Sequence, residues 1–104
     1  MRELQRKVRG FCEKHGLTCP LEFRFLDLVS ELGELAKEMI KSSDYGKGEF
    51  KFRREIKEEL GDVTFSLIVL ANQLNVDLEE ALNSAMEKYE RRIKERGSPS
   101  SGRN

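Results

Sequence analysis

Two acidic segments carry the residues whose types and spacing could do chemistry. Each segment contains carboxylates three or four residues apart, which in a helix places them on one face, and in the second segment two of them, Glu58 and Glu59, are also adjacent. The first segment contains Asp27, Glu31, Glu34 and Glu38, and the second contains Glu55, Glu58, Glu59 and Asp62. Carboxylates one turn apart repel each other by roughly 0.2–0.5 kcal/mol per exposed pair, so each stripe requires compensation from water, basic side chains or a cation.

Two interpretations of these stripes are open from spacing alone. In the first, they are solvated faces paired with basic neighbours such as Arg53, Arg54 and Lys57, because charged runs usually mark the wet side of a helix. In the second, they bind a metal ion. Residues 63–71 are apolar around most of the helix, which predicts Asp62 at the edge of the core, where an unpaired carboxylate is costly. Oxygen ligands from two helices would suit magnesium or manganese.

Nitrogen and sulfur ligands contribute little to a metal site in this sequence. The only histidine is His15, and no ExxH spacing is present, so a di-iron site of the ferritin type lacks its usual ligands. Cys12 and Cys19 do not form a CxxC pair, and we expect both to be reduced thiols.

Four helical segments must position the carboxylates, and their limits follow from apolar spacing and end signals. The expected helices cover residues 4–15, 21–40, 52–73 and 77–93. Gly16 is placed to end the first helix, and Asp77 with Glu80 forms a capping box at the start of the last. Because Asn75 interrupts the pattern only briefly, we expect the third and fourth helices to be antiparallel neighbours in an all-α four-helix bundle.

Length and composition predict one small domain that gains stability by self-association. The chain has 104 residues, of which 38% are hydrophobic and 37% charged, so its own core is modest and a dimer or tetramer is expected. We assign the domain to residues 1–96. Residues 97–104 are mainly glycine, serine and proline with little to bury, which predicts a disordered tail.

Charge and hydropathy argue against nucleic-acid and membrane partners. Lysine plus arginine and aspartate plus glutamate both number 19, so no overall field attracts a polyanion. No apolar run reaches the length of a membrane span, and the amino-terminal residues lack the apolar run of a signal peptide. We therefore expect a cytoplasmic protein.

Three motifs together resemble those of a known enzyme family. ELGE at residues 31–34, EELGD at residues 58–62 and the later EKYERR segment are similar to the motifs of MazG-type nucleoside triphosphate pyrophosphohydrolases, of the all-alpha NTP pyrophosphatase superfamily. The resemblance covers residues 23–92. It implies a helical bundle working as a homodimer or homotetramer, and a magnesium-dependent hydrolase that cleaves a nucleoside triphosphate, including deoxy or modified ones, to the monophosphate and pyrophosphate.

The resemblance also implies roles for particular residues. The magnesium ligands and catalytic acids would be Glu31, Glu34, Glu59 and Asp62. Lys88 and Arg92 in EKYERR would contact the triphosphate, although side chains covering apolar surface would explain the same spacing. Apart from the resemblance, Glu58 and Glu38 are spare carboxylates beside these ligands, and either could accept the proton of the attacking water as general base. Met86 stands where the family often has asparagine, which removes one expected polar contact.

Other functions fit the same features. The related phosphoribosyl-ATP pyrophosphatases and dUTP or dCTP pyrophosphatases share the helical architecture, and the ELGD glycine and the short chain favour the MazG type over them. A non-catalytic helical module that binds nucleotide or a protein partner would retain the acidic stripes as solvated faces. Magnesium-dependent release of pyrophosphate distinguishes the enzymes from such a module.

Overall fold

The chain folds into four α-helices. The computed structural model describes residues 1–100 and contains α1 (Arg2–His15), α2 (Leu21–Ser42), α3 (Arg54–Gln73) and α4 (Leu78–Arg96), with no strand in that range. The predicted limits of the helices are therefore confirmed to within a few residues, and so is the all-α class.

Local signals in the sequence explain where the helices end. Gly16 follows α1 with a φ of 62°, in the left-handed region where glycine costs least. Asn75 also has a positive φ, 57°, and turns the chain between α3 and α4. The Asp77 carboxylate then caps α4 by accepting hydrogen bonds from the backbone N–H groups of Glu79 and Glu80, at 2.9 and 3.2 Å.

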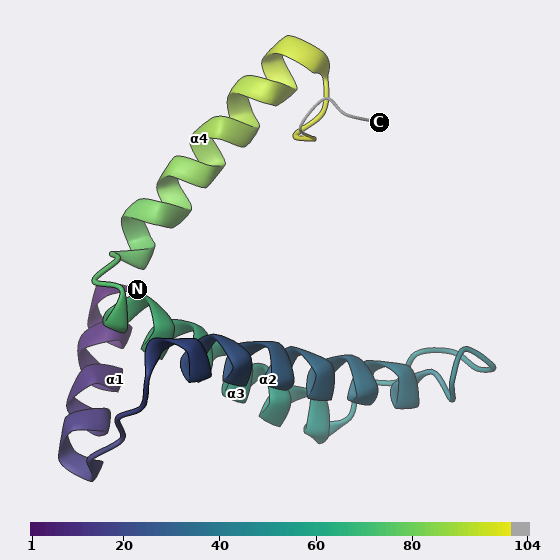
Figure 1. Cartoon of the computed structure of the whole chain (residues 1–104). Helices are drawn as coiled ribbons and strands as arrows, with labels where there is room; N and C mark the ends of the chain where they lie inside the picture. The colour runs from purple at the N-terminus through teal and green to yellow at the C-terminus, as the bar shows by residue number, and fades with distance from the viewer. Residues whose placement is uncertain (101–104) are drawn as a thin grey trace.

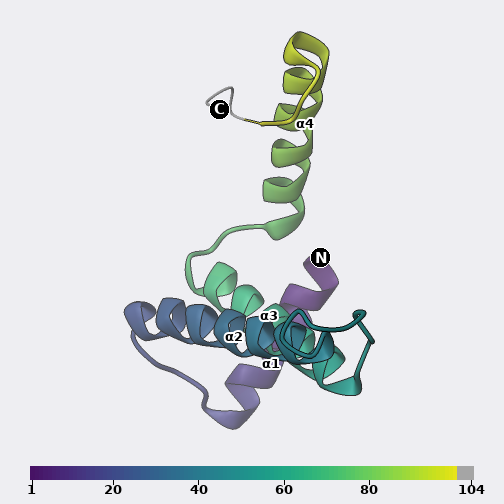
Figure 2. The same cartoon turned by 90° about the vertical axis from the view of Figure 1, so that its right-hand side faces the viewer.

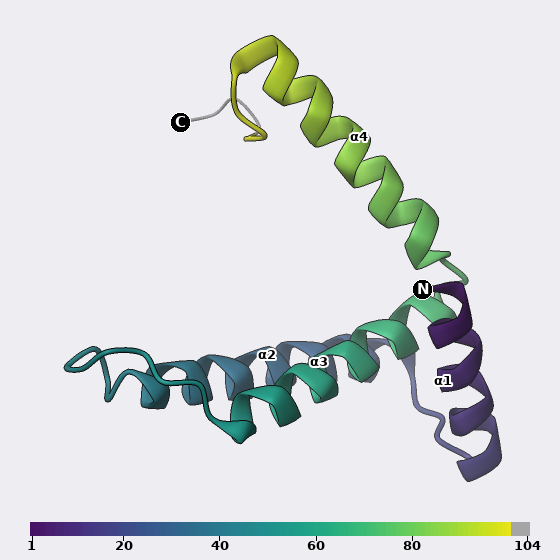
Figure 3. The ribbon, with the colours of Figure 1, turned by 180° about the vertical axis from the view of Figure 1, so that it is seen from behind.

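Three of the helices form the packed part of the molecule. Figures 1 and 3 show α2 and α3 lying side by side along their lengths, joined by the loop at residues 43–53, while α1 crosses the carboxyl end of α3. Of the pairs of different helices, only α2 with α3 and α1 with α3 have extensive contacts within the described chain. The acidic segments of α2 and α3 are thus brought face to face.

The fourth helix does not pack against the other three, so the expected antiparallel pairing of α3 and α4 within one chain is wrong. Figure 2 shows α4 projecting away from the α1–α3 unit. The radius of gyration is 17.0 Å, compared with about 13 Å for a compact chain of this length. The apolar side chains of α4 are correspondingly half exposed: Leu82, Met86, Tyr89 and Ile93. Within residues 1–100, three helices therefore pack together, and the apolar face of α4 is left uncovered.

The buried apolar core lies on α3. Ile56, Ile68, Val69 and Ala71 are the hydrophobic residues with less than a tenth of their surface exposed. Residues 68–71 belong to the apolar run that the sequence predicted to be buried, whereas Leu67 in the same run stays 41% exposed. Because α4 does not cover this side of α3, the run is buried on part of its circumference only.

A buried glutamine joins α1 to the turn that precedes α4. The Gln5 amide donates to Asn72 Oδ1 at 3.0 Å and to the Val76 carbonyl at 2.8 Å. Its side-chain oxygen accepts from the Leu78 N–H at 2.9 Å, and the Asn72 amide donates to the Gln5 carbonyl at 3.0 Å. Since Gln5 is only 6% exposed, these bonds replace water and fix the end of α3 against α1.

We expect Gln5→Leu to destabilise the protein by about 3 kcal/mol, because it leaves several buried polar groups without partners at roughly 1–3 kcal/mol each. Urea unfolding at a fixed protein concentration measures the change. Lys7→Gln, an exposed neighbour on α1, is the matched control and should leave the midpoint unaltered. Equal midpoints for the two variants would contradict a structural role of this network.

Residues 97–100 turn back toward α4. The carbonyls of Pro99 and Ser100 accept hydrogen bonds from Arg92 and Arg96, at 3.2 and 3.4 Å. The rest of the tail that the sequence predicted to be disordered, residues 101–104, lies outside the described residues. None of the helices in residues 1–100 combines the length and apolar character needed to cross a membrane.

Candidate active site

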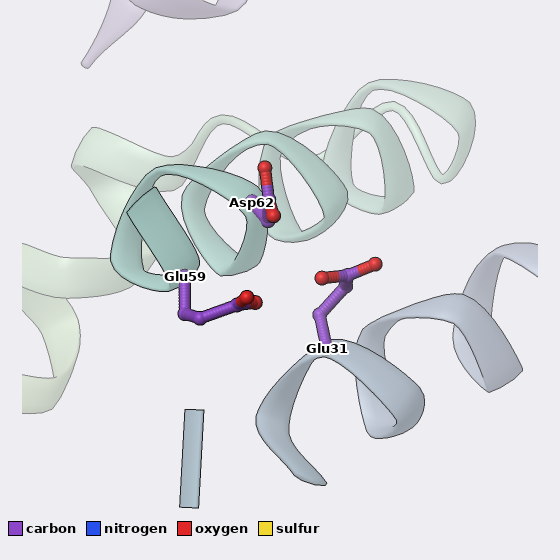
Figure 4. Close-up of side chains that lie close together, drawn as sticks. All are labelled: Glu31, Glu59 and Asp62. Atoms are coloured by element: carbon purple, nitrogen blue, oxygen red, sulfur yellow. The ribbon is translucent and has the colours of Figure 1, made fainter. Parts of the chain in front are cut away.

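Three carboxylates from two helices converge on one point. Glu31 extends from α2, and Glu59 and Asp62 extend from α3 one turn apart. Their nearest oxygens all lie within 4.8 Å of one another, and Figure 4 shows the three side chains directed toward a common space. Glu31 and Glu59 are half-buried and Asp62 is exposed, so the cluster opens to solvent on the Asp62 side rather than lying deep in the core.

An arginine at the start of α3 fixes α2 in the position that creates this cluster. Arg53 Nη2 donates to the Glu38 carboxylate at 2.8 Å and to the Glu38 carbonyl at 2.9 Å, and its Nε donates to the hydroxyl of buried Ser42 at 3.0 Å. A planar guanidinium making three bonds restricts how α2 can slide or rotate along α3. The hydrogen bond from Arg53 also holds the pKa of Glu38 below its usual value.

Basic neighbours pair with Glu38, Glu55 and Glu58, but not with the three converging carboxylates. Glu38 contacts Arg53 and also lies 3.8 Å from Lys41, and Glu58 lies 3.3 Å from Arg54 on an exposed surface. No ion pair within residues 1–100 involves Glu31, Glu59 or Asp62. The paired interpretation of the stripes therefore describes Glu38, Glu55 and Glu58, whereas the converging carboxylates have no basic side chain that offsets their charge in the described residues.

Partial burial and neighbouring negative charges both act on the pKa of Glu59. Its pKa is raised above the usual value, first by partial removal from water and then by the charges of Asp62 and Glu31. Three carboxylates without a basic partner, held on two packed helices, supply the oxygen ligands that a hard divalent cation prefers. The donor set therefore fits magnesium or manganese.

Glu34 lies at the rim of the cluster. It is exposed and is not one of the three residues whose oxygens converge. Its charge nevertheless contributes to the raised pKa of Glu59, which indicates that it is near. A change of side-chain rotamer, rather than of the backbone, would be the smallest movement that adds Glu34 as a fourth ligand.

The two basic residues expected to contact phosphate are not near the carboxylates of the same chain. Lys88 and Arg92 lie on α4, which projects away from α2 and α3. The Lys88 ammonium lies 5.3 Å from the centre of the Tyr89 ring, and Arg92 donates to the Pro99 carbonyl at 3.2 Å. Met86 is 50% exposed on the same helix, so it belongs to no core within one chain.

A cavity beside the cluster is lined in part by Arg24 and Phe65, two residues that the sequence analysis did not single out. It has a volume of about 270 Å³ and is lined by Arg24, Asp27, Glu31, Phe65, Ser66 and Val69. Arg24 is three residues before Asp27 on α2, a spacing that places both on one helix face and could have drawn attention to it. Glu31 borders both this cavity and the carboxylate cluster, so the two features adjoin at this residue.

Comparisons with known proteins agree with the fold and with the two acidic motifs. The MazG nucleotide pyrophosphohydrolase domain matches residues 24–97, which include both acidic segments and the whole of α3 and α4. The chain belongs to the MazG nucleotide pyrophosphohydrolase family. The expected resemblance is thereby confirmed.

Two known proteins are similar to this chain, over different lengths. The chain is 39% identical over 101 residues to the uncharacterized protein YpjD of Bacillus subtilis (strain 168), an alignment covering 92% of this chain and 88% of YpjD. It is 48% identical over 46 residues to the nucleoside triphosphate pyrophosphohydrolase/pyrophosphatase MazG of Thermotoga maritima. That alignment covers 44% of this chain and only 18% of the longer protein.

Solved structures show the same helical architecture. The Bacillus-conserved MazG protein, described as a nucleotide pyrophosphohydrolase, matches with a TM-score of 0.72 and 36% identity over 85% of this chain and 86% of its own. The putative pyrophosphatase YpjD from Bacillus subtilis matches with a TM-score of 0.69 and 36% identity over 86% of this chain and 91% of its own. The fold is therefore shared with proteins of the same family at substantial sequence identity.

Proposed function

We propose that this protein hydrolyses nucleoside triphosphates, deoxy or modified forms among them, to the monophosphate and pyrophosphate in a magnesium-dependent reaction. The observation that carries the proposal is the convergence of Glu31, Glu59 and Asp62 within 4.8 Å, without a basic partner in the described chain. Membership of the MazG family supports the reaction type. The name of the Bacillus-conserved relative, a nucleotide pyrophosphohydrolase, supports it further.

Each part of the site has a distinct task in this proposal. Glu31, Glu59 and Asp62 hold the metal, with Glu34 at the rim as the fourth ligand. Magnesium, or manganese in its place, would supply charge neutralisation of the phosphates and activation of the attacking water. Lys88 and Arg92 offset the charge on the departing pyrophosphate.

A general base must remove a proton from the attacking water, and the ion pairs distinguish the two candidates. Arg53 holds Glu38 by a short hydrogen bond and lowers the pKa of its carboxyl group, which weakens it as a base. Among residues 1–100, Glu58 pairs only with Arg54, and both side chains are largely exposed, so this pair is weak and easily opened. We therefore favour Glu58.

The isolated position of α4 supports an assembly of more than one chain. Its half-exposed apolar residues and its separation from the carboxylates are both resolved if α4 packs against the α2–α3 pair of another copy. We propose a homodimer or homotetramer in which Lys88 and Arg92 reach the carboxylates of a neighbouring chain.

The test of the proposed function is release of pyrophosphate from a panel of canonical and modified ribo- and deoxyribonucleoside triphosphates, with phosphoribosyl-ATP included. We expect release with magnesium and none with excess chelator. Turnover restricted to phosphoribosyl-ATP or to dUTP and dCTP would reassign the protein to one of the related pyrophosphatases. An absence of pyrophosphate release from every compound would refute the enzyme assignment and would leave a nucleotide-binding module as the remaining assignment.

A further inference from the structure

The cavity next to the carboxylate cluster has the size and the side chains of a nucleobase pocket. At about 270 Å³ it is smaller than pockets that enclose a whole drug-sized ligand, so it accommodates a base while the triphosphate lies outside at the carboxylates. Phe65 provides an aromatic surface in the wall of the cavity. Its ring makes an edge-on contact with the ring of Phe11, at 5.9 Å between centroids and 85° between planes, and this contact orients the Phe65 ring. Aromatic faces of this kind stack on bases of any type, so selectivity must come from the polar residues.

Arg24 is the polar residue of this cavity with the most unused hydrogen-bonding capacity. Its Nη2 donates to the Leu17 carbonyl at 2.8 Å, which ties the guanidinium to the loop between α1 and α2. Its Nε is buried without a partner, and Arg24 forms no ion pair with any described residue. A guanidinium has five N–H donors and no acceptor, and the hydrogen bond to Leu17 uses one of them, so the Nη groups retain donors for a ligand.

Asp27 supplies the complementary group on the same helix face. It is three residues after Arg24 and lines the same cavity, a spacing at which opposite charges usually pair. No ion pair joins them in the described chain. The cavity thus presents a set of donors and a set of acceptors side by side, neither of which is satisfied by the other.

We propose that Arg24 and Asp27 select a guanine base, so that the preferred substrates are guanine nucleoside triphosphates. This inference rests on the proposed function and assigns its substrate class. The guanidinium would donate to O6 and N7 of the base, the acceptor pair that arginine binds most often. The carboxylate would accept from N1–H and from the 2-amino group.

The other bases match this arrangement less well. Adenine places an amino donor where guanine has O6, which sets donor against donor at Arg24. Cytosine offers adjacent acceptors but a single donor group to Asp27, and uracil or thymine separates its two carbonyls by an N–H. Guanine therefore combines a two-acceptor edge with two neighbouring donors, as Arg24 and Asp27 require.

The test compares kcat/KM for dGTP, dATP, dCTP and dITP on the wild type and on Arg24→Gln, Arg24→Lys and Asp27→Asn. For the wild type we expect dGTP to exceed dATP by about ten- to one-hundred-fold. Arg24→Gln and Arg24→Lys should bring this ratio to within about threefold of unity, because neither retains the planar fork. Since dITP lacks only the 2-amino group, Asp27→Asn should remove the preference for dGTP over dITP.

Controls separate recognition of the base from damage to the fold. Arg6→Gln, which changes an exposed arginine of α1 outside this cavity, should leave all ratios unchanged. Melting temperatures identify any variant that does not fold. If Arg24→Gln does not fold, the single variants Arg24→Lys and Asp27→Asn carry the test, because a ratio of kcat/KM between two substrates is insensitive to the fraction of active protein.

Failure of this inference differs from failure of the proposed function. Turnover of all four triphosphates at similar rates, unchanged by Arg24→Gln, would overturn guanine selection and leave the reaction standing. If no triphosphate is hydrolysed, calorimetric titration with dGMP and dAMP decides: a preference for dGMP that Arg24→Gln removes supports the pocket, and equal or absent binding overturns it.

Discussion

Glu59→Gln should lower magnesium-dependent pyrophosphate release by about a thousandfold, since it removes a carboxylate whose oxygen lies within 4.8 Å of those of Glu31 and Asp62. The same change should raise the melting temperature of the metal-free protein. It replaces a partly buried carboxylate, whose pKa is raised by desolvation and by the charges of Asp62 and Glu31, with a neutral amide, so three converging negative charges become two. The stabilisation produced by added magnesium should largely disappear. Activity and metal-free stability therefore move in opposite directions.

Glu55→Gln is the matched control for this prediction. Glu55 lies one turn earlier on α3, is exposed and is 3.7 Å from Arg53, so its removal should alter neither the turnover nor the response to magnesium. Pyrophosphate release and thermal unfolding, each with magnesium and with chelator, give the four values needed. A Glu59→Gln protein that retains wild-type turnover would show that the cluster is not the catalytic centre.

Mixing two inactive variants should restore activity if α4 serves the carboxylates of another chain. One variant, Glu59→Gln, retains Lys88 and Arg92, and the other, Lys88→Ala with Arg92→Ala, retains the carboxylates. After unfolding and refolding together as a two-fold symmetric dimer, half of the assemblies are mixed and each has one intact site of two, so about a quarter of wild-type activity is expected. Neither variant refolded alone should reach this value.

A second mixture provides the control for this experiment. Glu59→Gln and Asp62→Asn both affect the same carboxylate cluster, so their mixed assemblies contain no intact site and should stay inactive. If Glu59→Gln with the α4 variant also stays inactive, and mixed assemblies are shown to form, the proposal that sites are shared between chains is wrong. In that case α4 would have to fold back onto α2 and α3 of its own chain.

The elements of the fold were predictable because their signals are local. Apolar spacing places each helix, and Gly16, Asn75 and Asp77 define the ends through backbone φ values and a side-chain cap. The facing of Glu31 with Glu59 and Asp62 was also within reach, since both motifs recur at helical spacing and two helices joined by a short loop pack side by side.

The position of α4 and the state of individual carboxylates were not predictable in the same way. An apolar helix face requires burial, but its sequence does not specify whether the covering surface belongs to its own chain or to another. Separating Glu38, held by Arg53, from unpaired Glu59 depends on which side chains meet across two helices. Arg24 was missed because its interest depends on a buried Nε that has no hydrogen-bond partner, and burial and hydrogen bonding of a single atom are known only from the structure.

The contacts of α1 also determine the order in which the chain can fold. The α2–α3 pair joins neighbouring segments and closes a short loop, which is rapid. In contrast, Gln5 bonds to Asn72, Val76 and Leu78, and Arg2 pairs with Asp77 at 2.7 Å. During synthesis the first helix therefore emerges from the ribosome well before the residues that receive it have been made, and we expect it to dock last, onto a hairpin already formed.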